Sequence, residues 1–138
     1  MSGPPPELIA AYQATRFCAK VPGEIVIRIG QNSEFLDVLL EEAGLKDWAF
    51  ITASNPQSQP LSDSENASRH ERLLADVEKY QPHVYQGEGV PDEGEWQPEI
   101  SLLVLGITRS DALRLGKHYG QHAIVVGKKK SPAELLLC

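Results

Sequence analysis

The sequence predicts a single α+β domain in which three or four helices pack on a mixed β-sheet, in an α/β-like two-layer arrangement. Segments with helical apolar periodicity alternate with short apolar segments typical of strands. The dipeptide Pro22-Gly23 lies between two such strand segments, so we expect a hairpin, and therefore antiparallel as well as parallel neighbours. The length of 138 residues fits one domain, residues 1–138, without a linker or a repeat.

The first half of the chain is expected to form two helices and three strands after a flexible proline-rich start at residues 1–6. Either Asn32 or Ser33 can cap the second helix, and Gly44 is a typical residue just after its end. Two strands flank the Pro-Gly turn, and the third is an uncharged apolar run, as expected of a central strand. The expected elements are a helix over 7–14, strands over 16–21 and 24–29, a helix over about 33–43 and a strand over 48–52.

The second half is expected to form two longer helices between strands. Ser62 and Glu65 form a capping box that opens the first of these helices, which should bury Tyr80 near its end. Thr108 caps the second, and the segment 133–138 is expected to be a strand, although its start also fits a helix cap. The expected elements are a helix over 62–80, a strand over 83–86, an acidic glycine-rich loop over 87–97, a strand over 99–107, a helix over 108–119 and a strand over 122–126.

Composition and motifs exclude several classes of protein. A net charge of −6 argues against a binder of the nucleic-acid backbone, which normally carries a basic face. Cys18 and Cys138 cannot form a disulfide framework, and His118 and His122 have a metal-like spacing that Gly120 interrupts. The sequence has no signal-peptide pattern, no nucleotide-binding motif and no apolar run approaching the roughly 18 residues of a membrane span. We therefore expect a cytoplasmic protein without metal or cofactor, which contacts neither a membrane nor a nucleic acid.

The uncharged segment 52–62 is the strongest candidate for a binding site. It leaves an apolar strand and enters a capped helix, and ligands of such folds bind beyond the carboxyl ends of strands and at helix N-termini. Asn66 and Arg69 share one face of this helix, and a long Arg69 side chain can point back at the loop and hold a carboxylate or a phosphate. Alternatively, the polar residues only build turns and caps, and Arg69 pairs with a surface acid.

Glu99 is the candidate for acid or base chemistry, because it stands at the start of the most apolar strand and close to Trp96. It is also a candidate partner of Arg69 if their elements are neighbours. The alternative is a solvated carboxylate beside an aromatic side chain that covers the edge of the sheet.

Five short motifs occur in one order along the chain, and together they resemble the domain-of-unknown-function family 3293. The resemblance covers about residues 11–134, and it implies a small cytoplasmic bacterial domain with no assigned activity. The motifs are Ile27-Arg28-Ile29-Gly30, Trp48-Ala49-Phe50-Ile51-Thr52-Ala53-x-Asn55-Pro56, Asn66-x-x-Arg69, Trp96-x-Pro98-Glu99-x-Ser101 and Gly120-Gln121-x-Ala123-Ile124-Val125. The polar motif residues are Thr52, Asn55, Ser58, Asn66, Arg69, Glu99, Ser101 and Gln121.

These residues predict a domain that binds a small polar or anionic ligand at the loop after the central strand, with Arg69 as the anchor. Two other functions stay open: a protein-protein interaction module that uses an acidic face or a sheet edge, and a small enzyme with Glu99 as acid or base and Arg69 as electrostatic stabiliser. The sequence leaves open whether the protein is an enzyme. The candidate ligand-binding residues are Thr52, Asn55, Ser58, Asn66, Arg69, Ser101 and Gln121.

Overall fold

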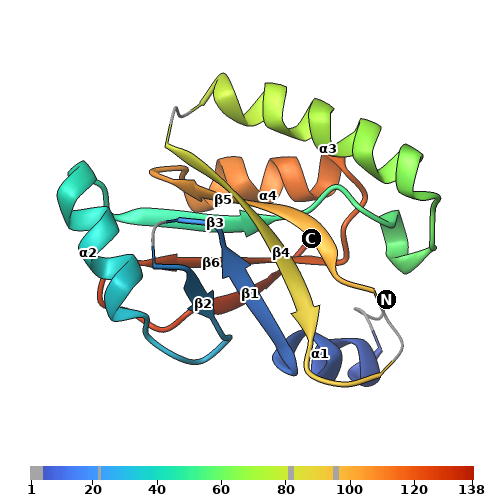
Figure 1. Ribbon diagram of the computed structural model, residues 1–138, viewed down its shortest axis with the longest axis horizontal. Coiled ribbons are helices and arrows are strands. Elements are labelled where there is room, and N and C mark those ends of the chain that lie inside the picture. The colour runs from blue at the N-terminus through green and yellow to red at the C-terminus, as the bar shows by residue number, and fades with distance from the viewer. Residues whose placement is uncertain (1–4, 22, 81–82, 95–96) are drawn as a thin grey trace.

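A computed structural model describes residues 5–21, 23–80, 83–94 and 97–138, and in these ranges it holds four α-helices and seven strands (Figure 1). The strands form one sheet in the order β2-β1-β4-β5-β3-β6-β7, and each neighbouring pair is antiparallel. The elements are α1 (Pro6–Gln13), β1 (Thr15–Ala19), β2 (Ile25–Ile27), α2 (Glu34–Ala43), β3 (Asp47–Ile51), the 3-10 turn η1 (Pro56–Ser58), α3 (Asp63–Glu78), β4 (Val84–Pro91), β5 (Glu99–Leu105), α4 (Arg109–His118), β6 (Ala123–Lys128) and β7 (Glu134–Leu137).

The two edges of the sheet meet at one point, so the sheet curls around its inner face. The Gly30 N–H donates to the Ala133 carbonyl oxygen at 2.8 Å, and the Ala133 N–H donates to the Gln31 carbonyl oxygen at 3.0 Å. Ile29 and Ala133 form a single parallel bridge there, just after β2 and just before β7. This contact satisfies backbone groups that an open sheet edge would leave unpaired.

Helices α3 and α4 cover the outer face of the curled sheet and lie side by side above it in Figure 1. Successive strand residues point to opposite faces, so Ala49 and Ile51 pack under these helices while Trp48 and Phe50 point inward. The buried residues of this outer layer are Ala49, Ile51, Ala53, Leu73, Val77, Leu102, Val104, Ile107, Ala112, Leu115, Tyr119, Ile124 and Val126.

The inner face of the sheet is filled mainly by large side chains of the sheet itself. Trp48 and Phe50 pack there with Leu103, Leu105 and Val125. Helix α2 closes one end of this inner core with two buried leucines, and α1 lies near the opposite end (Figure 1). The two ends of the inner core therefore differ in packing: α2 contributes buried side chains at one end, whereas α1 has no buried residue at the other.

Most of the expected elements are confirmed. The fold is α+β with four described helices; Ser33 caps α2, and the Ser62–Glu65 capping box opens α3. The end of the chain forms the strand β7 rather than a helix. The expected mixture of strand directions is reduced to the one parallel bridge between Ile29 and Ala133, since all pairs of named strands are antiparallel.

Two expectations were wrong. Residues 87–91 of the segment 87–97, expected as a loop, continue β4 as far as Pro91, because they pair with β1 on one side and residues 87–89 also pair with β5 on the other. Tyr80 is 39% exposed rather than buried, because α3 ends at Glu78.

Some expectations fall wholly or partly outside the described residues. Of the proline-rich start, residues 1–4 lie there, whereas Pro6 is already the first residue of α1. Pro22 of the expected turn and Trp96 also lie outside. Every helix in the described ranges is too short or too polar to cross a membrane.

Two glycines of β4 give a matched test of the inner packing. A Cβ on Gly87 would lie 2.5 Å from the Cys18 carbonyl oxygen and 3.0 Å from the Phe50 ring, whereas one on Gly89 would make ordinary contacts at 3.7 Å. We expect Gly87→Ala to lower the free energy of unfolding by about 1–3 kcal/mol, and Gly89→Ala to change it by less than about 0.5 kcal/mol. Urea unfolding of both variants measures the difference, and equal effects would contradict this packing.

Candidate functional site

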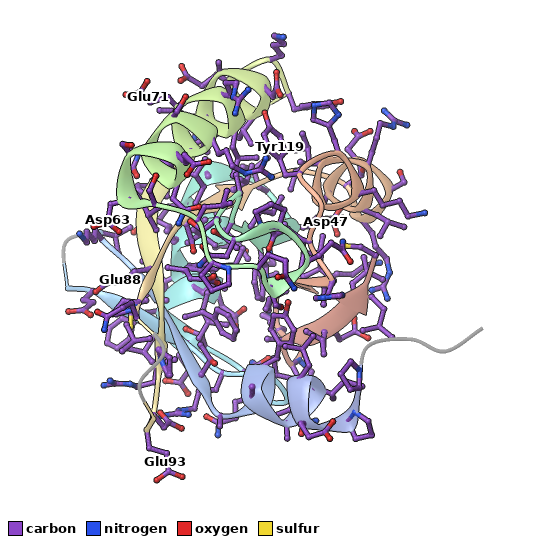
Figure 2. All side chains as sticks on the ribbon, turned by 90° about the vertical axis from the view of Figure 1, so that its right-hand side faces the viewer. Asp47, Asp63, Glu71, Glu88, Glu93 and Tyr119 are labelled. Carbon is purple, nitrogen blue, oxygen red and sulfur yellow. The ribbon has the colours of Figure 1, made fainter. Side chains whose placement is uncertain are left out.

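A cavity of about 300 Å³ lies inside the curl of the sheet, at the end where α1 is found. At this end of the sheet β3 and β4 finish, and β1, β5 and β6 begin. Figure 2 shows the protein from this end, with α1 at the bottom and the loop after β3 towards the viewer. The volume is at the lower end of the range of about 300–1,000 Å³ typical of ligand pockets. The apolar wall comes from Leu8, Ala11, Phe17, Phe50, Ile124 and Val125, and the polar wall includes Tyr12, Thr52, Asn55, Ser58, Glu99, Ser101 and Gln121.

The polar wall is formed where the inward-facing positions along β3 and β5 change from apolar to polar. Phe50 lies opposite both Leu103 and Val125, so these residues mark one level of the inner core. Two residues further towards the open end, the same face carries Thr52 after β3 and Ser101 in β5. Gln121, which precedes β6, adds an amide at this end. The sequence pattern thus ends the apolar core and begins a hydrogen-bonding surface at one boundary.

The loop after β3 has an unusual backbone. Asn55, Gln57 and Ser58 have φ angles of 47°, 54° and 58°, in the left-handed region that residues other than glycine rarely adopt. Three such residues within four positions cost energy that surrounding contacts must offset, and such strain is concentrated at functional sites.

A side-chain pair holds the first of these residues in place. The Asn55 N–H donates to Asn66 Oδ1 at 3.0 Å, and Asn66 Nδ2 donates to Asn55 Oδ1 at 2.9 Å. Asn55 Oδ1 also accepts the Leu61 N–H at 2.9 Å, which ties both ends of the loop to one side chain. Asn55 Nδ2 donates to Glu99 Oε2 at 2.8 Å and so connects the loop to the start of β5.

The same loop is docked on the turn that follows α4. The backbone N–H and Nε2 of Gln57 both donate to the Gly120 carbonyl oxygen, at 2.8 and 2.7 Å, and Gln121 Nε2 donates to the Ser54 carbonyl oxygen at 3.0 Å. Gly120 has a φ of +70°, and a Cβ there would lie 3.0 Å from the Pro56 side chain. Glycine is therefore required for this close approach.

Arg69 braces the loop from behind rather than reaching the cavity. Its Nε donates to the Ala53 carbonyl oxygen at 2.6 Å and its Nη2 to the Tyr119 carbonyl oxygen at 2.5 Å. The side chain does point back from α3 to the loop, as expected, but its guanidinium binds backbone carbonyls. The fork of N–H groups suits this bridge between two segments.

Two hydroxyl groups and the Tyr12 phenol complete the polar wall of the cavity. The Ser101 hydroxyl donates to the Glu99 carbonyl oxygen at 2.9 Å, and the Thr52 hydroxyl donates to the Ile100 carbonyl oxygen at 2.7 Å. Burial, together with the nearby Glu99 carboxylate, raises the pKa of Tyr12 to about 12. The Tyr12 phenol is therefore protonated at neutral pH.

The structure brings most of the candidate residues together. Asn66 and Arg69 do not line the cavity. Asn66 instead lines a second pocket of about 410 Å³, which Asn55 and Glu99 also line. Among the described residues, no group of three His, Cys, Asp or Glu side chains could hold a metal ion. The candidates that do line the cavity are Thr52, Asn55, Ser58, Glu99, Ser101 and Gln121.

Sequence reasoning missed the aromatic part of the site. Tyr12, Phe17 and Phe50 line the cavity, and they come from α1, β1 and β3. The helical spacing of Leu8, Ala11 and Tyr12 signals a face of α1 turned towards the protein, and these three residues do line the cavity. The sequence does not show which surface that face covers.

The bracing role of Arg69 gives a stability prediction with a matched control. We expect Arg69→Ala to lower the free energy of unfolding by about 1.5–3 kcal/mol, because the Ala53 and Tyr119 carbonyl oxygens lose a charged donor. Arg72→Ala removes the same charge from an exposed position on α3 and should change it by less than about 0.5 kcal/mol. Chemical denaturation compares the two variants, and an Arg69→Ala protein as stable as Arg72→Ala would contradict the bracing role.

The contact between Tyr119 and Asp76, which joins α4 to α3, predicts a pH dependence of stability. The Tyr119 hydroxyl donates to Asp76 Oδ2 and lowers the pKa of Asp76 below its usual 3.8, while burial and then this bond raise the pKa of Tyr119 to about 12. Because the pKa of Asp76 is lowered in the folded protein, this group stabilises the fold above its unfolded pKa, and the stabilisation is lost as the pH falls. Because the pKa of Tyr119 is raised, this group stabilises the fold below a pH of about 10, and the stabilisation is lost as the pH rises towards 12.

We therefore expect the stability difference between the unmodified protein and Tyr119→Phe to be largest between about pH 5 and 9 and to shrink on either side. Urea unfolding from pH 3 to 11 measures it. Tyr80→Phe, which removes the hydroxyl of a partly exposed tyrosine just beyond α3, is the control and should show no such profile. A difference for Tyr119→Phe that is independent of pH would contradict the assignment.

Comparison with known proteins identifies a family. No curated protein and no solved structure matches the chain. A family model described as "Protein of unknown function (DUF3293)" matches residues 51–124, which is more than half of the 138 residues. The matched range runs from the end of β3 to the start of β6 and contains all the polar motif residues of the site. The chain belongs to the DUF3293 family.

Proposed function

We propose that the protein binds a small organic molecule in the cavity beside α1. A polar head would contact Thr52, Ser101 and Gln121, and an apolar body would lie against Phe17 and Phe50. The observation that carries the proposal is the change from apolar to polar side chains on the inner face, at the level where the sheet encloses a cavity of about 300 Å³.

Stability alone does not account for this arrangement. A cavity forgoes the packing contacts that a filled core would make. The left-handed residues Asn55, Gln57 and Ser58 add a cost of about 1–3 kcal/mol each. A preformed pocket with a few convergent polar groups is the arrangement typical of small-molecule sites.

Of the two kinds of ligand that the sequence predicts, polar and anionic, we propose a polar one. The expected anchor, Arg69, binds two backbone carbonyls, and the described residues that line the cavity include no lysine or arginine. Glu99 would repel an anion at this position. The family resemblance supports a bacterial, cytoplasmic setting for such a binding protein.

Hydrogen bonding is favoured over proton transfer for Tyr12, the tyrosine that Glu99 influences. A catalytic acid or base needs a pKa near the working pH, and Tyr12, the neighbouring group that Glu99 influences, has a pKa of about 12. At neutral pH this phenol neither gives up nor gains a proton readily. This phenol is therefore better suited to hydrogen bonding than to proton transfer.

A cavity-blocking pair of variants tests the proposal. Ala10 and Ala11 are both exposed on α1, but only Ala11 lines the cavity. In a fragment screen by protein-observed NMR, we expect hits to shift the amide signals of Thr52, Ser58, Ser101 and Gln121. Ala11→Trp should weaken these hits at least about tenfold, because an indole occupies the mouth of the cavity, whereas Ala10→Trp should leave them unchanged. Hits that shift other regions, or that bind Ala11→Trp normally, would contradict the proposal.

A further inference from the structure

We infer that the ligand is a small organic cation, a primary amine or a guanidine on an aryl or cycloalkyl body, whose charged head binds at Glu99. This inference rests on the proposed function, because it names the class of molecule that the same cavity takes. Three independent features of the cavity lead to it: the hydrogen-bond inventory of its polar wall, its charge and its aromatic side chains.

The polar wall has used most of its donor hydrogens inside the protein. The Thr52 hydroxyl donates to the Ile100 carbonyl oxygen, and the Ser101 hydroxyl donates to the Glu99 carbonyl oxygen. Gln121 Nε2 donates to the carbonyl oxygens of Ser54 and Tyr119, at 3.0 and 3.3 Å. Each of these side chains keeps at least one lone pair. A hydroxyl has two acceptor sites, of which Thr52 uses one for the Ser54 N–H at 3.0 Å, and the Gln121 amide has a separate acceptor oxygen.

Acceptors therefore dominate what the polar wall offers to a ligand. Gln121 Oε1 accepts no hydrogen bond from the described residues. Glu99 adds a carboxylate, which already accepts the Asn55 Nδ2 hydrogen bond at 2.8 Å and which, like any carboxylate, has about four acceptor sites. The hydroxyls of Tyr12 and Ser58 can rotate to accept as well as donate. A head group that is rich in N–H donors fits this wall, and an ammonium brings three donors and no acceptor.

The charge of the cavity has the sign that such a head group needs. The described residues that line it include two carboxylates, Glu93 and Glu99, one histidine, His122, and no lysine or arginine. Figure 2 shows Glu93 pointing away from the sheet, which leaves Glu99 as the carboxylate at the polar wall. The raised pKa of Tyr12, caused first by burial and then by Glu99, is consistent with a negative potential there. Charge-assisted hydrogen bonds are roughly twice as strong as neutral ones.

Aromatic rings complete the environment. Tyr12, Phe17 and Phe50 line the cavity, and the Phe17 and Phe50 rings are in edge-to-face contact with centroids 5.4 Å apart. Aromatic faces attract organic cations and also pack against a flat apolar body. A carboxylate among aromatic side chains is thus suited to an amine, and the small volume limits the body to about one ring.

Matched triplets of probes test the head group on the unmodified protein. Each triplet keeps one body, either benzyl, phenethyl or cyclohexylmethyl, and varies the head between an amine, an alcohol and a carboxylate. Calorimetric titration at pH 7.5 gives the dissociation constants. We expect the amine of the best-fitting body to bind at least about tenfold tighter than its alcohol, and the carboxylate to bind more weakly than the alcohol.

A pair of charge variants then assigns the preference to one residue. Glu99→Gln keeps the shape of the side chain and should reduce the amine-to-alcohol ratio to about two or less. Glu88→Gln makes the same change on β4 at a residue that does not line the cavity, and it should keep the ratio of the unmodified protein. Circular dichroism without ligand checks the fold of both variants.

The outcomes separate the inference from the proposed function. An alcohol that binds as tightly as its amine overturns the inference and leaves the proposed function standing. An amine preference that survives in a folded Glu99→Gln protein also overturns it. Absence of binding by every triplet overturns the inference, and the fragment screen with Ala11→Trp decides the proposed function on its own. If Glu99→Gln does not fold, the ratios on the unmodified protein still decide the head group.

Discussion

The curl of the seven-stranded sheet is the constraint on which both the core and the cavity depend. Backbone hydrogen bonds at Ala133 join the two edges, so the sheet has an outer face, which α3 and α4 cover, and an enclosed inner face. The inner face is filled by its own large side chains, and glycines make room for them: a Cβ on Gly127 would lie 2.6 Å from the Trp48 ring. Where this filling stops, at the end next to α1, the enclosed space becomes the cavity.

The loop after β3 is held by contacts from three directions. From α3, the Asn66 side chain accepts the Asn55 N–H. From the turn after α4, the Gly120 carbonyl oxygen accepts hydrogen bonds from the backbone N–H and the side-chain amide of Gln57. From β5, the Glu99 carboxylate accepts a hydrogen bond from the Asn55 side chain. Such bracing offsets the cost of the left-handed residues. A preorganised site also loses less conformational entropy on binding, so a small ligand can be held by few contacts.

The sequence predicts local features well, because they depend on neighbouring residues. The caps at Ser33 and Ser62, the apolar strands and the polar segment after β3 are all signalled within a few positions of the chain. The role of Arg69 is not predictable in this way, since its partners are the backbone carbonyls of Ala53 and Tyr119, and a carbonyl has no signature in the sequence. The strand glycine Gly87 resembles a loop residue for a related reason, because the Phe50 ring that takes its space comes from another strand.

The cavity is lined partly by residues that the family model matches and partly by residues outside the matched range, and this has a consequence for specificity. Apart from Tyr12, the residues named in the polar wall lie within the range 51–124 that the family model matches, whereas α1 and β1 lie outside it. Leu8, Ala11, Tyr12 and Phe17 nevertheless supply much of the wall on which the body of a ligand would rest. A head group would therefore be recognised by the matched part of the fold, and the size and shape of its body by the N-terminal segment. Because Ala11 is exposed on α1, substitutions there can change the body that fits without disturbing the hydrogen bonds that recognise the head.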